Sequence, residues 1–370
     1  MISKRKVKKI LIFGFLGLGD MVMFSPCLKL LRNGFPDSQI VLVTNLESVR
    51  SLFKKSPYID HLIYFDILRA NFVEKLKFLH SLRKMHFDIS ISPYPSYRLE
   101  LNLISFITGA EKRFSFNFHK GTLSQLLFLN NCRLNVDSTL HTVDCNLKLM
   151  NSLGLQTDGQ EKYDIPVECS GTFIDNFLNE KNIRPYDFKV GIHPGSDIRS
   201  KGKRLDICKF AEISDFLADM YEAKVLLFLG QHEEGLKNEF MHSARHSHIV
   251  VEHLELEKIA QLISSCALFI SNDSGLMHVA SAMQTPIVAI FGPSNHVSVA
   301  PWKVVHQVVR LGLDCSPCFF GTERHSMKKP LIECKIDDKF ACMRRMEVRD
   351  VITKVEKMIM LLYPEKRNSH

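Results

Sequence analysis

Short apolar runs alternate with longer stretches in which apolar side chains recur every three or four residues. Runs such as 7–13, 39–44 and 189–193 have the length and branched side chains of buried strands. The stretches between the runs have the spacing of helices that bury one face. Regular alternation of this kind predicts α/β units, each with a mostly parallel sheet covered by helices on both faces.

The same pattern gives the expected elements one by one. Segment 117–137 has no clear period, and we expect a loop or a short helix there. We expect strands at 7–13, 39–44, 61–65, 87–91, 112–116, 189–193, 224–229, 267–270 and 287–291, and helices at 21–32, 46–54, 71–84, 141–153, 172–181, 207–220, 257–264, 276–283 and 348–362.

The chain is too long for one ordinary core, because 370 residues exceed the size at which single domains stop growing. Pro166, Gly171 and Pro185 mark an interruption of the pattern near the middle. We therefore expect an N-terminal domain at 1–160, a linker region at 161–188, a second domain at 189–345 and a closing helical segment at 346–370.

Composition narrows the class of protein. Hydrophobic residues make up 45% and charged residues 24%, as in ordinary soluble domains. No apolar stretch is long enough to span a bilayer, and ten cysteines without an export signal suggest reduced thiols in a cytoplasm. The net charge of +8 suits an anionic substrate or a negatively charged membrane surface. Nucleic acid is not expected, because no nucleic-acid-binding motif accompanies the charge.

A polar turn follows the strand expected at 267–270. Its residues, Asn272-Asp273-Ser274-Gly275, precede a helix, and His278 lies one turn into that helix. The first N–H groups of a helix have no intrahelical partner and carry the positive end of the dipole. A turn of Ser and Gly lets an anion approach them, so the motif suits a diphosphate. The alternative is an ordinary capped helix.

Three glycines and an acid follow the first strand. Gly14, Gly17 and Gly19 do not have the spacing of a dinucleotide-binding loop. Asp20 stands at the start of the next helix, where it is either a helix cap or a general base facing the crevice at the carboxyl ends of the strands. Arg98 follows the strand at 87–91 and is a candidate cation for the same region.

The second domain opens with a further candidate anion site. Gly195 and Ser196 follow its first strand, and Lys203 and Arg204 come shortly afterwards. These cations could offset charge on a departing diphosphate, or they could belong to a solvated basic loop. A glutamate after the strand at 224–229 could accept hydrogen bonds from a ribose diol, or simply complement the dipole of its helix.

Four cysteines lie close together near the end of the chain. Cys315 and Cys318 have the two-residue spacing of a metal knuckle, whereas Cys334 and Cys342 are too far apart to form a matching one. We expect free or redox-labile thiols, with a structural zinc site as the less favoured interpretation.

Taken in order, these stretches resemble glycosyltransferase family 9, the lipopolysaccharide heptosyltransferase family. The resemblance covers most of the chain, and the Asp-Ser-Gly-x-x-His stretch is its most specific part. It is carried by Gly19-Asp20, His193-Pro194-Gly195-Ser196, Lys203-Arg204, Asn272-Asp273-Ser274-Gly275-Leu276-Met277-His278, Phe291-Gly292-Pro293-Ser294 and Pro301-Trp302.

The resemblance implies a GT-B fold: two Rossmann-like domains facing across a cleft, with the last helix crossing back to the first domain. It implies inverting, metal-independent sugar transfer without a required cofactor. The donor would be a nucleotide sugar, by family usage ADP-heptose. The acceptor would be a lipid-linked glycan of the lipopolysaccharide core at the inner face of the inner membrane. The enzyme is then expected to be cytoplasmic, peripheral on that membrane and monomeric.

The resemblance also implies roles for single residues. Asp20 matches the family's catalytic base, and the loop with Gly17 and Gly19, together with Arg98, would serve the acceptor or an anion. Glu234, or second to it Glu233, matches the acid that binds the ribose. The residues that match donor-binding positions are Ser196, Lys203, Asp273, Ser274, Gly275 and His278.

Two departures from the family pattern leave an alternative open. Many members carry a basic residue where Gly14 stands, and Leu205-Asp206 replaces a common aromatic-proline pair. Lys201 or Arg204 could therefore take the part of Lys203. The alternative is a catalytically silent member that binds a nucleotide sugar or a membrane surface. A nucleotide-sugar epimerase fits the ordered motifs less well, and a dehydrogenase least.

Overall fold

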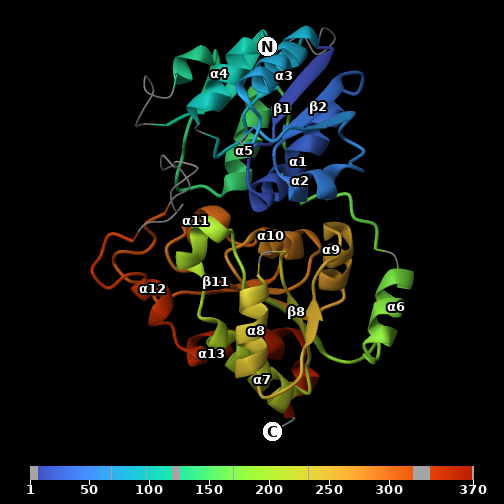
Figure 1. Cartoon of the computed structure of the whole chain (residues 1–370), viewed down its shortest axis with the longest axis vertical. Helices are drawn as coiled ribbons and strands as arrows, with labels where there is room; N and C mark the ends of the chain where they lie inside the picture. Colours follow the sequence, from blue (N-terminus) through green and yellow to red (C-terminus); the bar gives the residue numbers. More distant parts are fainter. Residues whose placement is uncertain are drawn as a thin grey trace. The chain divides into compact units, whose positions relative to one another are not determined.

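The computed structural model of the chain describes residues 7–67, 69–96, 98–118, 126–169, 171–231, 233–319 and 334–368. The chain divides into two compact units, Met1–Pro166 and Val167–His370. Each unit is a parallel sheet with helices on both faces (Figure 1), which confirms the predicted α/β class. The lysines and the arginine at positions 4–6 lie outside the described residues.

Strands and helices alternate through the first unit almost without exception. Its sheet has the order β3-β2-β1-β4-β5-β6, and all of its strand pairs are parallel. The elements are β1 (Lys9–Phe13), α1 (Leu18–Gly34), β2 (Gln39–Thr44), α2 (Glu47–Phe53), β3 (His61–Tyr64), α3 (Phe72–Lys84), β4 (Ile89–Ile91), α4 (Leu99–Ile107), β5 (Lys112–Asn117), η2 (Leu127–Leu129), β6 (Cys132–Asn135) and α5 (Thr142–Ser152).

The central strands of the first sheet are buried on both faces, which is why they read as continuous apolar runs. On one face, Leu11 and Phe13 pack with Phe78 and Leu82 of α3 and with the inward side chains of α4. Elsewhere in the unit, helix α1 packs against α5 and against α2. The strand order β3-β2-β1-β4 reverses direction at β1, so loops after β1 and β4 meet at the carboxyl edge of the sheet.

The second unit repeats this plan. Its sheet has the order β12-β11-β10-β7-β8-β9, again with parallel pairs. The elements are α6 (Gly171–Glu180), β7 (Lys189–His193), η3 (Ile198–Lys203), α7 (Ile207–Tyr221), β8 (Lys224–Phe228), α8 (Glu234–Ser243), β9 (Ile249–Val251), α9 (Leu256–Ser264), β10 (Leu268–Asn272), α10 (Gly275–Ala282), β11 (Ile287–Ile290), α11 (His296–Val299), β12 (His306–Val309), α12 (Ala341–Arg344), α13 (Val348–Leu362) and η4 (Pro364–Asn368).

Aromatic packing at the centre of this sheet requires a glycine. A Cβ added to Gly191 in β7 would lie 2.6 Å from the ring of Phe269 and 3.0 Å from that of Phe228. The two rings cross edge to face, with centroids 5.6 Å apart. A side chain at Gly191 would therefore force apart the strands on either side of β7.

Some elements differ from the expectation. Helix α4 and strands β6, β9 and β12 were not expected, because each is short and lacks a clear period. In the closing helix α13, the buried residues Val351, Val355, Met358 and Ile359 belong to the core of the second unit, and its crossing to the first domain stays a prediction. Helix α6 lies in the expected linker, where a helix was predicted at 172–181, and it packs on α9 of the same unit.

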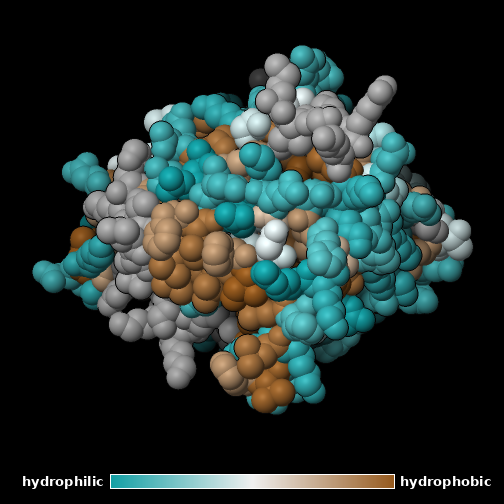
Figure 2. All heavy atoms as spheres, turned by 90° about the horizontal axis from the view of Figure 1, so that it is seen from above, coloured by the Kyte–Doolittle hydropathy of each residue, from teal (hydrophilic) through white to brown (hydrophobic). Residues whose placement is uncertain are grey.

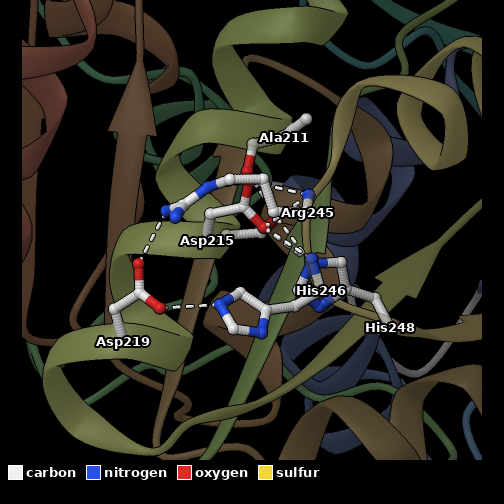
Figure 3. Close-up of polar contacts among 7 residues, drawn as sticks. Ala211, Asp215, Asp219, Arg245, His246 and His248 are labelled. Carbon is white, nitrogen blue, oxygen red and sulfur yellow. Dashed lines mark hydrogen bonds and ion pairs between the residues drawn. The ribbon is translucent and has the colours of Figure 1, made fainter.

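A polar cluster fastens α7 to the segment between α8 and β9 (Figure 3). The backbone N–H of Arg245 donates to both carboxylate oxygens of Asp215 at 3.0 and 2.9 Å, and that of His246 donates to Oδ1 at 3.1 Å. One turn along α7, Asp219 accepts from the Arg245 guanidinium at 2.6 Å. Buried His248 lies 3.0 Å from Ser214 Oγ and 3.6 Å from Asp215 Oδ1.

This cluster ties the stability of the second unit to pH. Burial raises the pKa of Asp215, but the donated N–H groups outweigh burial and leave that pKa below its ordinary value. Burial lowers the pKa of His248, which Asp215 only partly opposes. In both cases the unfolded chain binds protons more readily than the folded chain, so acid favours unfolding.

We expect the free energy of unfolding to be highest above about pH 6.5, the unperturbed histidine pKa, and to decline as the pH falls below it. The variant His248→Gln should show a shallower decline between neutral and mildly acid pH, because it removes one group that must take up a proton. Urea unfolding across this pH range measures both slopes. Equal slopes for the two proteins would contradict the role of His248.

Candidate functional site

Polar side chains gather where β7, β8 and β10 of the second unit end. The strand order reverses between β7 and β10, and open α/β sheets bind ligands at such a point. The loop after β7 carries Ser196, the loop after β8 carries Glu233, and Asp273 follows β10. The chain thus brings the two anion-binding motifs of the sequence to one edge of one sheet.

Asn272 joins these loops. Its side chain is fully buried, donates to the carbonyl of Pro194 at 2.7 Å and accepts from the N–H of Leu205 at 3.0 Å. Asn272 is the last residue of β10, and the helix cap expected in this turn is Ser274. One amide therefore positions the segments that precede and follow η3 against the end of β10.

Lys203 and Asp273 form a largely buried ion pair beside it. The Lys203 Nζ lies 2.9 Å from Asp273 Oδ2, and the side chains are only 14% and 10% exposed. Burial raises the pKa of Asp273, but the Lys203 ammonium, with His278 as a lesser contributor, lowers it below the ordinary value. Asp273 is thus ionised at neutral pH and holds the lysine at the start of α10.

The N-terminus of α10 completes this group. Ser274 is the cap, and its Oγ accepts from the N–H of Met277 at 3.3 Å and lies 3.0 Å from Ser271 Oγ. Gly275 opens the helix, and His278 is buried one turn further. Helix N–H groups, a fixed ammonium and a Ser-Gly turn together suit an anion such as a diphosphate.

A second buried pair lies on the other side of β7. Arg204 Nη2 is 3.3 Å from Glu233 Oε1, and Arg204 Nε donates to Ser196 Oγ at 2.9 Å. Glu233 Oε2 accepts from the N–H of Gly230 at 2.8 Å. A Cβ on Gly195 would lie 2.0 Å from the Glu233 carboxylate, so a side chain there would displace that carboxylate. The sequence analysis named Ser196, Arg204 and Glu233 singly but did not predict that they contact one another, because they come from two separate loops.

The two neighbouring glutamates therefore have different surroundings. Glu233 is buried and bonded to Arg204 and Gly230, whereas Glu234 is exposed at the first position of α8. Beneath them, buried His193 shares a hydrogen bond of 2.8 Å with the Phe228 carbonyl, and burial lowers its pKa. The sequence left open whether Lys203 or Lys201 serves the donor site. Lys203 is paired with Asp273 inside the site, whereas Lys201 is exposed.

In the first unit, Asp20 lies in the first turn of α1. The helix begins at Leu18, Gly17 is its cap, and Asp20 is the third helical residue rather than the cap. Its Oδ2 accepts from the N–H of Gly17 at 3.2 Å. Gly19 belongs to the same turn, so the glycines and the acid form one short segment at the carboxyl end of β1.

Other groups border this segment. Arg98 is half-buried and precedes α4, at the carboxyl side of β4. Tyr94 is buried, with its backbone N–H donating to Asn146 at 2.9 Å; burial raises its pKa, and the charges of Cys145 and Asp20 add to the rise. The sequence did not single out Asn146.

Gly14 stands where the family resemblance led us to expect a basic residue. A Cβ there would lie 2.8 Å from Leu42 and 3.2 Å from the Val43 carbonyl, which accepts the Gly14 N–H at 2.7 Å. A long side chain at this position would require the neighbouring strand to shift. The departure from the family pattern is therefore built into the packing of β1 against β2.

The four C-terminal cysteines line one cavity of about 90 Å³ together with Pro293 and Phe340. Burial raises the pKa of Cys342 to about 11, and the charges of Cys318, Cys315 and Cys334 add to the rise. All ten cysteines of the chain lie in its described part and are free thiols. Across those described residues, no three His, Cys, Asp or Glu side chains are arranged to hold a metal ion.

The cysteine segment also supports the lysine loop. The N–H of Phe340 donates to Cys334 Sγ at 3.2 Å, and a Cβ on Gly202 would lie 2.1 Å from the Phe340 ring. Gly202 immediately precedes Lys203, so this packing helps to position the ammonium.

Within the described ranges, no helix is both long and apolar enough to cross a bilayer.

We expect Lys203→Met to lower the free energy of unfolding by about 3 kcal/mol, because it leaves Asp273 buried without its ion partner. Lys201→Met, at an exposed position of the same loop, should change it by less than about 0.5 kcal/mol. Adding Asp273→Asn to Lys203→Met should recover much of the loss. Urea unfolding at neutral pH checks all three, and a loss that Asp273→Asn does not reduce would contradict this account.

Comparison with known proteins places the chain in a family. The model of glycosyltransferase family 9 (heptosyltransferase) matches residues 75–329, more than half of the chain. Lipooligosaccharide heptosyltransferase 2 of Campylobacter jejuni serotype O:6 is 28% identical, over 92% of this chain and 96% of that protein. Lipopolysaccharide heptosyltransferase 2 of Escherichia coli K12 is 26% identical, over 82% and 88%.

A solved structure, that of E. coli ADP-heptose lps heptosyltransferase II, superposes with a TM-score of 0.72 at 21% identity. It covers 95% of this chain and 99% of that one. At this identity the likeness supports the fold, and it confirms the predicted GT-B class with two Rossmann-like units. The family model, which matches more than half of the chain, shows family membership as well as fold. The chain therefore belongs to glycosyltransferase family 9, the heptosyltransferase family, and is a glycosyltransferase.

Proposed function

We propose that the chain transfers a heptose from ADP-heptose onto a growing lipopolysaccharide core, with inversion at the anomeric carbon. The observation that carries the proposal is the Lys203–Asp273 pair beside the N-terminus of α10, at the point where the order of the second sheet reverses. This arrangement suits the diphosphate of a nucleotide sugar. Family membership then selects a glycosyl donor over other nucleotides.

The donor site uses the residues at the carboxyl edge of the second sheet. Lys203, Ser274, Gly275 and His278 would bind the diphosphate, while Asp273 holds Lys203 in place. Because positive charge and helix N–H groups are already directed at the leaving group, the proposed reaction requires no divalent metal. Structural zinc at the cysteine cavity remains the less favoured interpretation of those thiols.

The ribose acid is proposed to be Glu234. Its carboxylate is exposed at the start of α8, whereas that of Glu233 accepts from Arg204 and Gly230. Glu233 would instead act as a positioning residue, because it holds Arg204, which donates a hydrogen bond to Ser196. In this account Ser196 contacts the donor, and the buried pair keeps its hydroxyl in place.

The chemical step would use Asp20 as general base. The acceptor hydroxyl oxygen forms a bond to the anomeric carbon as its proton passes to the Asp20 carboxylate. The bond from that carbon to the diphosphate oxygen breaks, and its electron pair leaves with ADP. One displacement inverts the centre and needs one base, unlike the two carboxylates of a glycosidase. Gly17, Gly19 and Arg98 border the acceptor side.

The acceptor is inferred from the relatives, which are named lipooligosaccharide and lipopolysaccharide heptosyltransferases. Their names support a lipid-linked glycan as the acceptor, and the family resemblance implies the inner face of the inner membrane as its place. The enzyme would then work in the cytoplasm as a monomer, peripheral on that membrane. The net charge of +8 fits both an anionic donor and an anionic membrane surface.

Two observations favour a second candidate function. The Asp20 carboxylate already accepts a helix N–H, and Gly14 replaces an expected cation. A chain in which Asp20 is only structural would bind a nucleotide sugar or a membrane surface without catalysing transfer. Donor binding without turnover would identify this case.

We expect Asp20→Asn to lower kcat by about 10²–10⁴-fold, because an amide cannot accept the proton of the hydroxyl. Its carbonyl oxygen can still accept from Gly17, so melting temperature and donor affinity should stay close to wild type. Transfer assays and calorimetry measure these quantities.

Asp20→Ala is the matched variant, since it removes both the base and the helix-start hydrogen bond. It should lose stability as well as turnover. An Asp20→Asn enzyme with wild-type turnover would show that Asp20 has only a structural role.

We expect ADP to raise the melting temperature more than UDP, GDP or CMP do, since a ligand of the folded state stabilises it by mass action. Calorimetry should show ADP affinity reduced about tenfold or more in Lys203→Met and unchanged in Lys201→Met. His278→Ala should also abolish the selective rise. If another nucleotide selectively raised the melting temperature, its sugar conjugate would replace ADP-heptose as the proposed donor. If no nucleotide raised the melting temperature, the result would contradict the donor site.

A further inference from the structure

The first unit exposes several large apolar side chains on neighbouring elements. On α3, Phe72 is 74% exposed, Val73 56% and Leu76 50%. Figure 2 views the end of the molecule at which α3 and α4 lie in Figure 1 and shows hydrophobic side chains gathered there among hydrophilic ones. We define the apolar surface patch as the exposed side chains of Phe72, Val73, Leu76, Leu103, Phe106 and Phe128.

The patch spans adjacent elements of one face. Helices α3 and α4 pack against each other and on the same side of the sheet, and η2 packs against α4. The inward side chains, such as Phe78 and Ile104, fill the core, so the exposed members of the patch are not needed for it. Apolar side chains this exposed on neighbouring helices indicate an interaction site.

Basic residues share the outer face of α3 with the patch. At 100° per residue, the arc that holds Phe72, Val73 and Leu76 also holds Lys77, His80, Arg83 and Lys84, and it contains no acid. Along the helix, the apolar residues of this arc come first and the basic residues follow.

Further cations border α4. Arg83 donates from Nη1 to the carbonyl of Ile107 at 2.8 Å, and the Arg113 guanidinium lies 5.6 Å from the centre of the Phe106 ring. The nearby acids, Glu74 and Glu100, stand in first helical turns, where the helix dipole offsets their charge. The Glu74 carboxylate also accepts a hydrogen bond from the backbone N–H of Asn71 at 2.8 Å.

We propose that the apolar surface patch docks the enzyme on a bilayer that contains anionic phospholipids. Apolar side chains on an amphipathic helix insert at the headgroup boundary, and neighbouring Lys and Arg bind lipid phosphates. Charge complementarity selects this occupant over a second copy of the chain, because two cationic faces of a protein with net charge +8 repel each other.

The proposal identifies the residues that would bring the enzyme to a lipid-linked acceptor. It rests on the proposed function only because a lipid-linked acceptor requires the enzyme to reach a membrane. Vesicle binding itself needs neither donor nor acceptor. The patch lies on α3, α4 and η2, none of which carries a donor-site residue of the second unit. Changes in the patch should therefore leave ADP binding intact.

The test is co-sedimentation of the full chain with vesicles of phosphatidylcholine alone or mixed with phosphatidylglycerol. Wild type should bind the mixed vesicles, weakly bind the neutral ones, and lose binding as salt screens the charges. Phe72→Ser/Leu76→Ser and, separately, Lys77→Glu/Lys84→Glu should each weaken binding to mixed vesicles about tenfold. Both should keep wild-type melting temperature and ADP affinity.

Matched controls come from the second unit, where Met241 and Leu361 are 40% and 61% exposed. Met241→Ser/Leu361→Ser removes a similar amount of exposed apolar surface and should not change vesicle binding. Equal binding by wild type and patch variants, or no binding to either vesicle, would overturn the proposal. Self-association in ultracentrifugation that the patch variants abolish would also overturn it and assign the face to a second copy.

Discussion

The side-chain amide of Asn272 holds together the loops of the second unit on which the candidate donor site depends. It binds the Pro194 carbonyl and the Leu205 N–H at once, and it does so from the buried end of β10. Its two bonds bracket the segment that carries Ser196 and Lys203. If this amide were lost, two buried backbone groups would need new partners, and the distance from Lys203 to α10 would no longer be fixed.

Two buried ion pairs, one on either side of β7, position different parts of the candidate donor site. Lys203 with Asp273 places a cation at the helix N-terminus, and Arg204 with Glu233 holds Ser196. In each pair the carboxylate stabilises a cation that would otherwise be costly to hold away from water. A leaving diphosphate benefits from charges that are already oriented, because no reorganisation is then needed during the reaction.

Much of the fold could be predicted from the chain alone. The strands at 39–44 and 189–193 occupy the predicted residues, because central parallel strands are buried on both faces and read as continuous apolar runs. The edge strands β6, β9 and β12 and helix α4 could not be predicted, since short elements leave little pattern. The motif after β10 was visible because helix caps and anion sites use the same few polar residue types.

The sequence by itself determined the fold class, the family and the residue types of the candidate site, since these follow from local pattern and ordered motifs. Only the tertiary structure decided which of those residues meet. Glu233 was the less favoured acid, and the structure buries it against Arg204 from the loop after β7 and Gly230 of its own loop, while Glu234 stays exposed. Such pairings depend on distances between segments far apart in the chain, which sequence spacing does not encode.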